Sequence, residues 1–220
     1  MLITGGVTID GSTLFAPPPP PGGSLESSFS ILGYANSSDW NMGTGDFTVE
    51  WFGFQTNANQ GTWFGFSSGD SLEAATSSNA FTLYNGGTLL ANIGIAAYTN
   101  VWIHWAITRS NNVIRIFRAG TQISTDISNS SNLTTSGRLR LGIGNTNLVG
   151  RFTQFNWVKG TALYTSNFTP PSQPLNANPN SKLLLLVKSD SEKFIDSSGT
   201  GKTPDQTTGI SYNSSSPFNS

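Results

Sequence analysis

Residues 101–109, Val-Trp-Ile-His-Trp-Ala-Ile-Thr-Arg, are the stretch that decides the fold class of this chain. Alternate residues of an extended segment point to opposite faces, so Ile103, Trp105 and Ile107 share one large apolar face. The other face begins with Trp102 and is also mostly apolar. Such a pattern predicts a central strand of a β-sheet, covered on both sides.

The sequence on either side repeats short apolar runs separated by turn residues. Asn111-Asn112 ends the central strand, Ala119-Gly120 makes a second turn, and Asn85-Gly86 is typical of a type I′ hairpin turn. A polar, Gly-punctuated loop is expected at 39–46. Further strands are predicted at 28–34, 47–52, 62–66, 81–84, 88–95, 113–118, 121–127, 138–143, 151–158 and 182–187. Short strands at this spacing, without sustained helical periodicity, indicate an all-β sandwich or barrel.

The composition supports one large β domain. Of 220 residues, 36% are hydrophobic and 11% aromatic, which is enough for one sizeable core because aromatic side chains bury the most area. Charged residues make up only 10%, against about 25% in an average domain. Gly, Ser, Thr and Asn replace them, so we expect a neutral polar surface.

Charge and cysteine content exclude several functional classes. The net charge of −1 gives no electrostatic reason to expect nucleic acid or an anionic membrane as a partner. The absence of cysteine excludes disulfides, thiolate metal sites and cysteine nucleophiles. The first residues carry neither a basic region nor a long apolar run, so we expect no signal peptide and no membrane span.

Three units are expected along the chain. Residues 1–16 form an extended arm for assembly, residues 17–23 a spacer with a glycine hinge, and residues 24–220 the sandwich. Polyproline is stiff and lacks internal hydrogen bonds, which suits a spacer. The arm's apolar residues are Leu2, Val7, Ile9 and Leu14, and the spacer prolines are Pro17, Pro18, Pro19, Pro20 and Pro21. The alternative is a tail without a function.

Five segments, in order, carry a family resemblance: GTGDFTVEW at 43–51, WIHWAITR at 102–109, LRLGIG at 139–144, FNWVKGTALYTSNFTPP at 155–171, and LLLL at 183–186 with DSSG at 196–199. Together they resemble laminin-G-like, concanavalin A-like lectin/glucanase domains over residues 24–218. The segment 155–171 is similar to such domains in phage and marine-virus structural proteins.

The resemblance implies an all-β, concanavalin A-like jelly-roll β-sandwich. It also implies that residues 196–218 run beside 24–30 and close the edge of a sheet, since an open edge invites unwanted pairing. This chain departs from the family pattern at 154–158 and at Ala119-Gly120, where acidic residues are replaced.

The acidic residues argue against an enzyme. Glucanases of this fold need two neighbouring carboxylates. The glutamates of this chain, Glu26, Glu50, Glu73 and Glu192, lie far from other acids on any expected strand. The single histidine, His104, cannot form a zinc site, and no Ser-His-Asp order is suggested. A structural hydrogen bond is its expected role, with a ligand contact as the alternative. We therefore expect no catalytic residue and no cofactor.

Aromatic residues beside Asn-, Ser- and Gly-rich loops suit a sugar site. Trp40, Trp63 and Tyr84 are the candidates, with core packing as the alternative for most tryptophans. We expect Trp40 or Trp63 to be exposed.

A calcium ion needs six to eight oxygen ligands. Asp39, Asp46, Asp70 and Asp126 lie in or near Asn-rich loops but are scattered, so a calcium site built largely from backbone oxygens stays open beside simple turn capping.

These observations favour a non-enzymatic virion protein: a capsid decoration, a fibre, or a tail or baseplate appendage on the virion surface. Its arm would bind other virion proteins by strand pairing, its sandwich would face outward to touch host glycans, and it would form a homo-oligomer in the particle. The alternative is a soluble carbohydrate-binding module without an assembly role.

Overall fold

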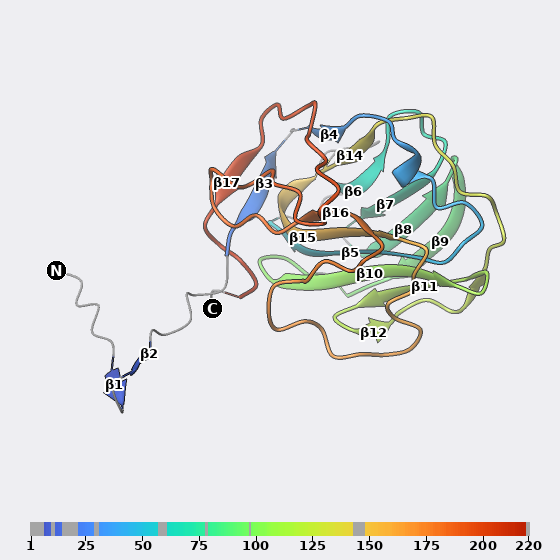
Figure 1. Ribbon diagram of the computed structural model, residues 1–220. Coiled ribbons are helices and arrows are strands. Elements are labelled where there is room, and N and C mark those ends of the chain that lie inside the picture. Colours follow the sequence, from blue (N-terminus) through green and yellow to red (C-terminus); the bar gives the residue numbers. More distant parts are fainter. Residues whose placement is uncertain are drawn as a thin grey trace.

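The chain folds as a jelly-roll β-sandwich, as predicted, with two antiparallel sheets packed face to face (Figure 1). The computed structural model describes residues 22–28, 31–56, 61–77, 79–96, 98–142 and 148–218, and the backbone of 7–9 and 12–14. Within those residues, no helix is long and apolar enough to cross a membrane.

The larger sheet has nine strands. Its order is β12 (Thr121–Gln122), β11 (Val113–Arg118), β10 (Trp102–Ser110), β5 (Phe47–Gln55), β15 (Val149–Lys159), β3 (Ser24–Ser28) and β17 (Ser211–Asn213). Two further strands join it: β13 (Ile127–Ser128) pairs with β11, and β16 (Ser181–Leu185) pairs with β15. Strand β10 lies between β11 and β5 and is buried from Ile103 to Arg109, which confirms the predicted central strand.

The smaller sheet has six strands in the order β4 (Leu32–Tyr34), β14 (Leu139–Leu141), β6 (Gly61–Phe66), β7 (Leu72–Thr76), β8 (Ala80–Asn85) and β9 (Thr88–Gly94). A short 3₁₀ helix, η1 (Ser38–Trp40), follows β4. The core between the sheets is strongly aromatic. Trp51 and Trp105 stack with centroids 6.5 Å apart, and Phe64 packs edge-on against Trp51 at 5.7 Å.

The predicted hairpin turns form, with one shift of position. Asn111 and Asn112 both have positive φ, as do Ala119 and Gly120. Between β8 and β9 the turn residues are Gly86 and Gly87, one position later than predicted, with φ of 55° and 78°. Two positive φ angles define the type I′ turn that matches the twist of paired strands.

The prediction of one strand over residues 28–34 is wrong. The chain instead leaves the nine-stranded sheet after β3 and enters the six-stranded sheet at β4, with Phe29 and Ser30 outside the described residues. The prediction of one strand over residues 121–127 is also wrong. Only its two ends are strands, β12 at the beginning and the first residue of β13 at the end.

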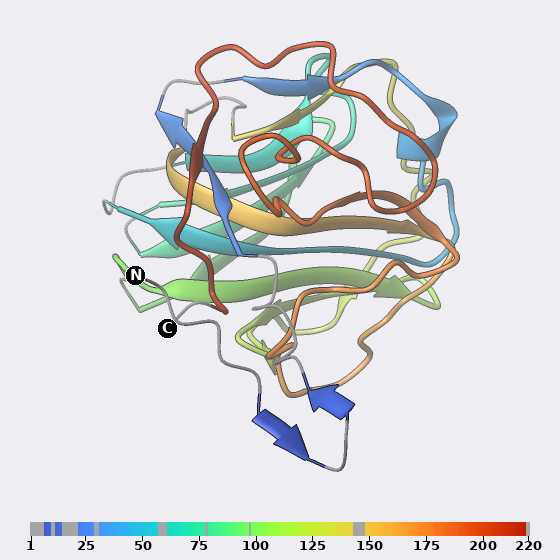
Figure 2. The same ribbon diagram turned by 60° about the vertical axis from the view of Figure 1, so that its left-hand side comes forward.

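The C-terminal segment closes one edge of the larger sheet, as expected. Strand β17 pairs with β3, with Tyr212 opposite Leu25, and Figure 2 shows the two strands side by side. In the N-terminal arm, β1 (Val7–Ile9) and β2 (Ser12–Leu14) form an antiparallel pair with each other and with neither sheet of the sandwich. The arm's side chains and the prolines of the spacer lie outside the described residues.

Candidate functional site

The outer face of the nine-stranded sheet is covered over β10 and β11. The segment that follows β15, orange in Figure 1, lays Tyr164 and Phe168 against it, and these two rings stack at 3.6 Å. Phe168 also packs on His104 at 5.7 Å and on Phe117 at 5.4 Å. A ligand therefore has no access to this part of the sheet.

A buried polar network lies beneath that cover. The carboxylate of Glu50 is bonded to His104 Nε2 at 3.1 Å and accepts hydrogen bonds from Tyr164 Oη at 2.8 Å and Asn156 Nδ2 at 2.9 Å. Glu50 is 1% exposed and His104 2%. Burial is the main cause of the raised pKa of Tyr164, and the nearby charge of Glu50 adds to it. The network joins the sheet to its cover, and the structural role expected for His104 is confirmed.

The outer face of the six-stranded sheet carries a row of outward positions across five strands. Arg140 on β14 points outward, because its neighbours Leu139 and Leu141 are buried in the core. In the sheet it lies between Gly33 of β4 and Gly65 of β6. Across β7 and β8, Glu73 is paired with Tyr84. The side chain of Glu73 lies over Gly65, where an added Cβ would be 3.2 Å from Glu73 Oε2. The side chains of Arg138 and Gln206 lie over Gly33 in the same way, since an added Cβ there would be 2.8 Å from Arg138 Cδ and 2.9 Å from Gln206 Oε1.

A pocket of about 490 Å³ opens along this row. Its lining includes Arg140, Glu73 and Tyr84, and the loops after β6 and β8 complete the rim with Ser68 and Gly87. Ligand pockets in proteins commonly enclose about 300–1,000 Å³ and combine an apolar surface with a few convergent polar groups. This pocket has both, and it lies on an open sheet face.

Of the three predicted sugar-site residues, only Tyr84 lines this pocket, where it is half-buried. Sequence reasoning missed Arg140 and Glu73. The signal that could have found Arg140 is a single charged residue between apolar neighbours, Leu139-Arg140-Leu141, which is typical of a strand with one open face. Glu73 lies in a segment whose residues favour helix, so it had no such signal.

The rim of the pocket is fixed by Asp70, in the loop between β6 and β7. Its carboxylate accepts hydrogen bonds from Ser68 Oγ, from Thr135 Oγ1 at 2.6 Å, and from Ser136 N and Oγ, both at 2.8 Å. Burial opposes ionisation, but these hydrogen bonds outweigh it and hold the pKa of Asp70 below its ordinary value. The ionised carboxylate therefore ties the rim to the loop before β14.

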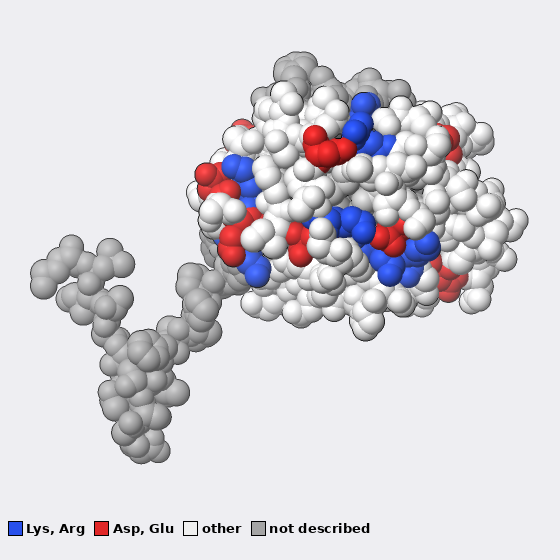
Figure 3. Space-filling view, turned by 45° about the horizontal axis from the view of Figure 1, so that its top comes forward, with Lys and Arg blue, Asp and Glu red and all other residues white. Residues whose placement is uncertain are grey.

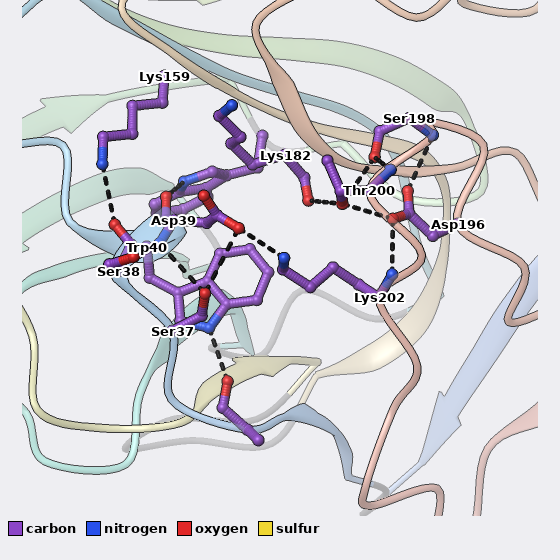
Figure 4. A network of polar contacts seen from close by, with 12 residues as sticks. Ser37, Ser38, Asp39, Trp40, Lys159, Lys182, Asp196, Ser198, Thr200 and Lys202 are labelled. Atoms are coloured by element: carbon purple, nitrogen blue, oxygen red, sulfur yellow. Dashed lines mark hydrogen bonds and ion pairs between the residues drawn. The ribbon is translucent and has the colours of Figure 1, made fainter.

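The expected exposure of Trp40 is wrong. Its side chain is 0% exposed, packed edge-on against Tyr34 at 6.3 Å and Trp157 at 6.1 Å. Figure 4 shows Lys202 reaching past the indole ring to Asp39, at 2.5 Å from the carboxylate. Because η1 turns the ring inward and Lys202 closes over it, no face of the indole is free.

The expected exposure of Trp63 is also wrong, since the side chain is only 2% exposed. A β-bulge between Thr62 and Phe64 shifts the register of β6. Bulges redirect side chains, and here Trp63 lies against Gly53 in the core. Its indole N–H donates to Thr76 Oγ1 at 3.1 Å, so its polar atom is satisfied without solvent.

The four aspartates considered for calcium bind protein groups instead, each in a separate place. Asp39 pairs with Lys202, Asp70 holds the rim, and Asp126 pairs with Arg115 at 2.7 Å. Asp46 accepts a hydrogen bond from Asn111 N. In the described residues, no three His, Cys, Asp or Glu side chains come together to hold a metal ion.

Charged groups on the face seen in Figure 3 occur as small clusters of both signs, separated by wide uncharged areas. In two places a basic and an acidic side chain form an ion pair, Arg138 with Asp205 and Lys202 with Asp39. This face therefore matches the low charge expected from composition.

No protein-family model matches the chain, and no curated protein matches it. Among solved structures, a proposed carbohydrate binding protein from Bacteroides ovatus aligns at 15% identity with a TM-score of 0.69, over 94% of this chain. This chain spans 65% of that protein's length. A heptameric SAP-like pentraxin from Limulus polyphemus aligns at 14% identity with a TM-score of 0.60, over 91% of this chain and 98% of the pentraxin. At these identities the two matches establish a shared lectin-like jelly-roll fold.

Proposed function

We propose that this protein binds carbohydrate in the pocket on the outer face of its six-stranded sheet, with Tyr84 as the aromatic contact. The observation that carries the proposal is the meeting of Tyr84, Glu73 and Arg140 in one hollow of the open face. An aromatic ring offers a flat apolar surface, while the carboxylate and guanidinium bond hydroxyl groups. The likeness to a structure described as carbohydrate binding adds support.

The proposal is for binding rather than catalysis. Glycoside hydrolysis commonly uses two carboxyl groups on either side of the scissile bond. Glu73 is the single carboxylate among the described residues that line the pocket. Glu50 lies beneath the cover of the opposite sheet, where no substrate reaches it.

The test is glycan-array screening of the full chain, followed by titration calorimetry with the strongest ligand. Tyr84→Ala should weaken binding at least tenfold, about 1.4 kcal/mol, because the ring is the main apolar contact. The matched control is Thr82→Ala, two residues earlier on β8 and outside the pocket lining. Equal affinities of the wild type and Tyr84→Ala would refute the proposed site.

We further propose that residues 1–16 anchor the domain to a larger assembly. This assembly is a virion, and the sandwich faces outward from its surface. The supporting observation is that β1 and β2 pair with each other and with neither sheet. A strand-forming segment outside the sandwich has backbone edges to offer to a partner. The five prolines from Pro17 to Pro21 suit a spacer between anchor and sandwich.

Deletion of residues 1–21 tests the anchoring proposal. Particles assembled with the truncated chain should lack it, whereas the full chain should be incorporated. Incorporation of the truncated chain at normal levels would rule out the arm as the anchor. This outcome is independent of glycan binding, which the truncated chain should retain.

A further inference from the structure

We propose that the glycan carries a carboxylate group, as uronic and sialic acids do, and that Arg140 binds this group. This inference rests on the proposed function and names the class of sugar. It starts from one observation: Arg140 lines the pocket and makes no hydrogen bond, ion pair or ring contact among the described residues.

The other five arginines all have partners. Arg109 donates to backbone carbonyls, Arg115 and Arg138 pair with aspartates, Arg151 bonds Asn213, and Arg118 lies over the rings of Tyr98 and Trp105. The buried Nε of Arg140 lacks a partner, as does that of Arg151, but Arg151 has its bond to Asn213. A half-buried guanidinium without an acceptor loses hydration without compensation, so an arriving anion is favoured there.

The cross-strand positions on either side of Arg140 offer it no partner of their own. Its two cross-strand neighbours, Gly33 and Gly65, have no side chains that could pair with it. The guanidinium carries several donors in a planar fork that matches the two oxygens of a carboxylate. Because the pocket is partly shielded from water, the attraction is stronger than at an open surface.

Glu73 restricts where the acidic group can lie. Its side chain extends over Gly65, between its own strand and β14. A carboxylate placed beside Glu73 is repelled, whereas sugar hydroxyls can donate to it. The pocket thus orients one acidic sugar, with its carboxylate on Arg140 and its hydroxyls toward Glu73 and Tyr84.

Paired ligands that differ only in the acidic group provide the test. Oligogalacturonate is compared with its methyl ester, and sialyllactose with lactose, by calorimetry on the full chain. The acidic member of at least one pair should bind ten or more times better, and the pair that responds identifies the source of the carboxylate. The preference should weaken with added salt.

Variants then assign the preference to Arg140. Arg140→Gln should reduce affinity for the acidic ligand to the affinity measured for its neutral partner, so that the acidic preference is lost. The control is Arg115→Gln, on the nine-stranded sheet, which should keep the preference. Thermal melting of each variant verifies that the fold is retained.

The outcomes separate the two proposals. Neutral ligands that bind as well as acidic ones and depend on Tyr84 would overturn the acidic-sugar inference and leave the proposed function intact. An acidic preference that survives Arg140→Gln would also overturn it. Failure of all glycans to bind would overturn both.

Discussion

Arg109 shows how one residue can join two loops to the end of a central strand. It is 0% exposed, and its guanidinium donates to Gly45 O at 2.9 Å, Gly43 O at 2.6 Å and Ser131 O at 2.9 Å. Nη2 also donates to Gly45 O at 2.6 Å, and a fifth bond reaches Asn129 Oδ1 at 3.3 Å. Since carbonyls rather than carboxylates accept these bonds, the side chain fixes the backbone on both sides of β10.

We predict that Arg109→Met lowers the free energy of unfolding by about 3 kcal/mol, because several buried carbonyls lose their donors. Urea denaturation measures the change. Arg115→Met removes a surface pair and should cost under about 1 kcal/mol. Similar losses in the two variants would contradict the special role of Arg109.

Asp70 gives the rim of the pocket a defined pH dependence. Its pKa is lower in the folded state than the ordinary 3.8, so the ionised form stabilises the fold. That contribution is complete above the unfolded-state pKa and is lost as the pH falls below it. We predict that Asp70→Asn is less stable than the wild type at pH 7 and that the two converge toward pH 2.

Urea midpoints of the wild type and Asp70→Asn, measured across that pH range, check this prediction. Ser68→Ala removes one donor to the carboxylate and should show a smaller difference in the same direction. A constant difference between wild type and Asp70→Asn at every pH would show that ionisation of Asp70 does not stabilise the loop.

At the scale of elements, most strands were predictable because alternation and turn residues act locally. Strand β7 was not predicted, because Leu72-Glu73-Ala74-Ala75-Thr76 is rich in residues that favour helix. Its pairing with β6 and β8 overrides that preference. Long-range pairing is the part of the fold that local sequence does not encode.

The candidate site shows the same limit. Tyr84 could be selected from its loop context, but Arg140 and Glu73 meet it only through the strand order β14-β6-β7-β8. Trp40 and Trp63 were misjudged because a short 3₁₀ helix and a β-bulge turn them inward. Neither feature has a clear signature in the sequence.

Strand β9 is an element with an unprotected edge. Among the described strands it pairs only with β8, and its sequence, Thr-Leu-Leu-Ala-Asn-Ile-Gly, carries no charge. Beside it lies a groove of about 460 Å³, lined in part by Leu90, Ile93 and Ile127. Long uncharged edges readily pair with other chains, so we expect concentration-dependent self-association.

We predict that Asn92→Lys, an exposed position on β9, reduces this association. Static light scattering over a concentration series measures it. Thr208→Lys adds the same charge at an exposed position of the C-terminal segment and should leave the association unchanged. An equal effect of both variants would point to net charge instead of the β9 edge.

At the scale of the whole molecule, the two sheets have different outer faces. The segment after β15 covers β10 and β11, while β14, β6, β7 and β8 present their pocket to solvent. This difference explains why the Glu50 network is buried while the pocket beside Arg140 opens to solvent. The position of the site follows from what each sheet leaves open.

The N-terminal arm should contribute little to the stability of the sandwich, whereas the C-terminal segment should contribute to it. Strands β1 and β2 pair only with each other, whereas β17 pairs with β3, and Phe218 packs on Phe52 at 5.2 Å. Deletion of residues 1–21 should therefore leave the melting temperature within about 2 °C of the full chain. Deletion of residues 211–220 should lower it by about 4 °C or more, since 1 kcal/mol corresponds to roughly 2–4 °C at this size. Calorimetric melting of both truncated chains measures these changes. A large fall in melting temperature on removing the arm would mean that the arm packs on the sandwich and is not free to anchor.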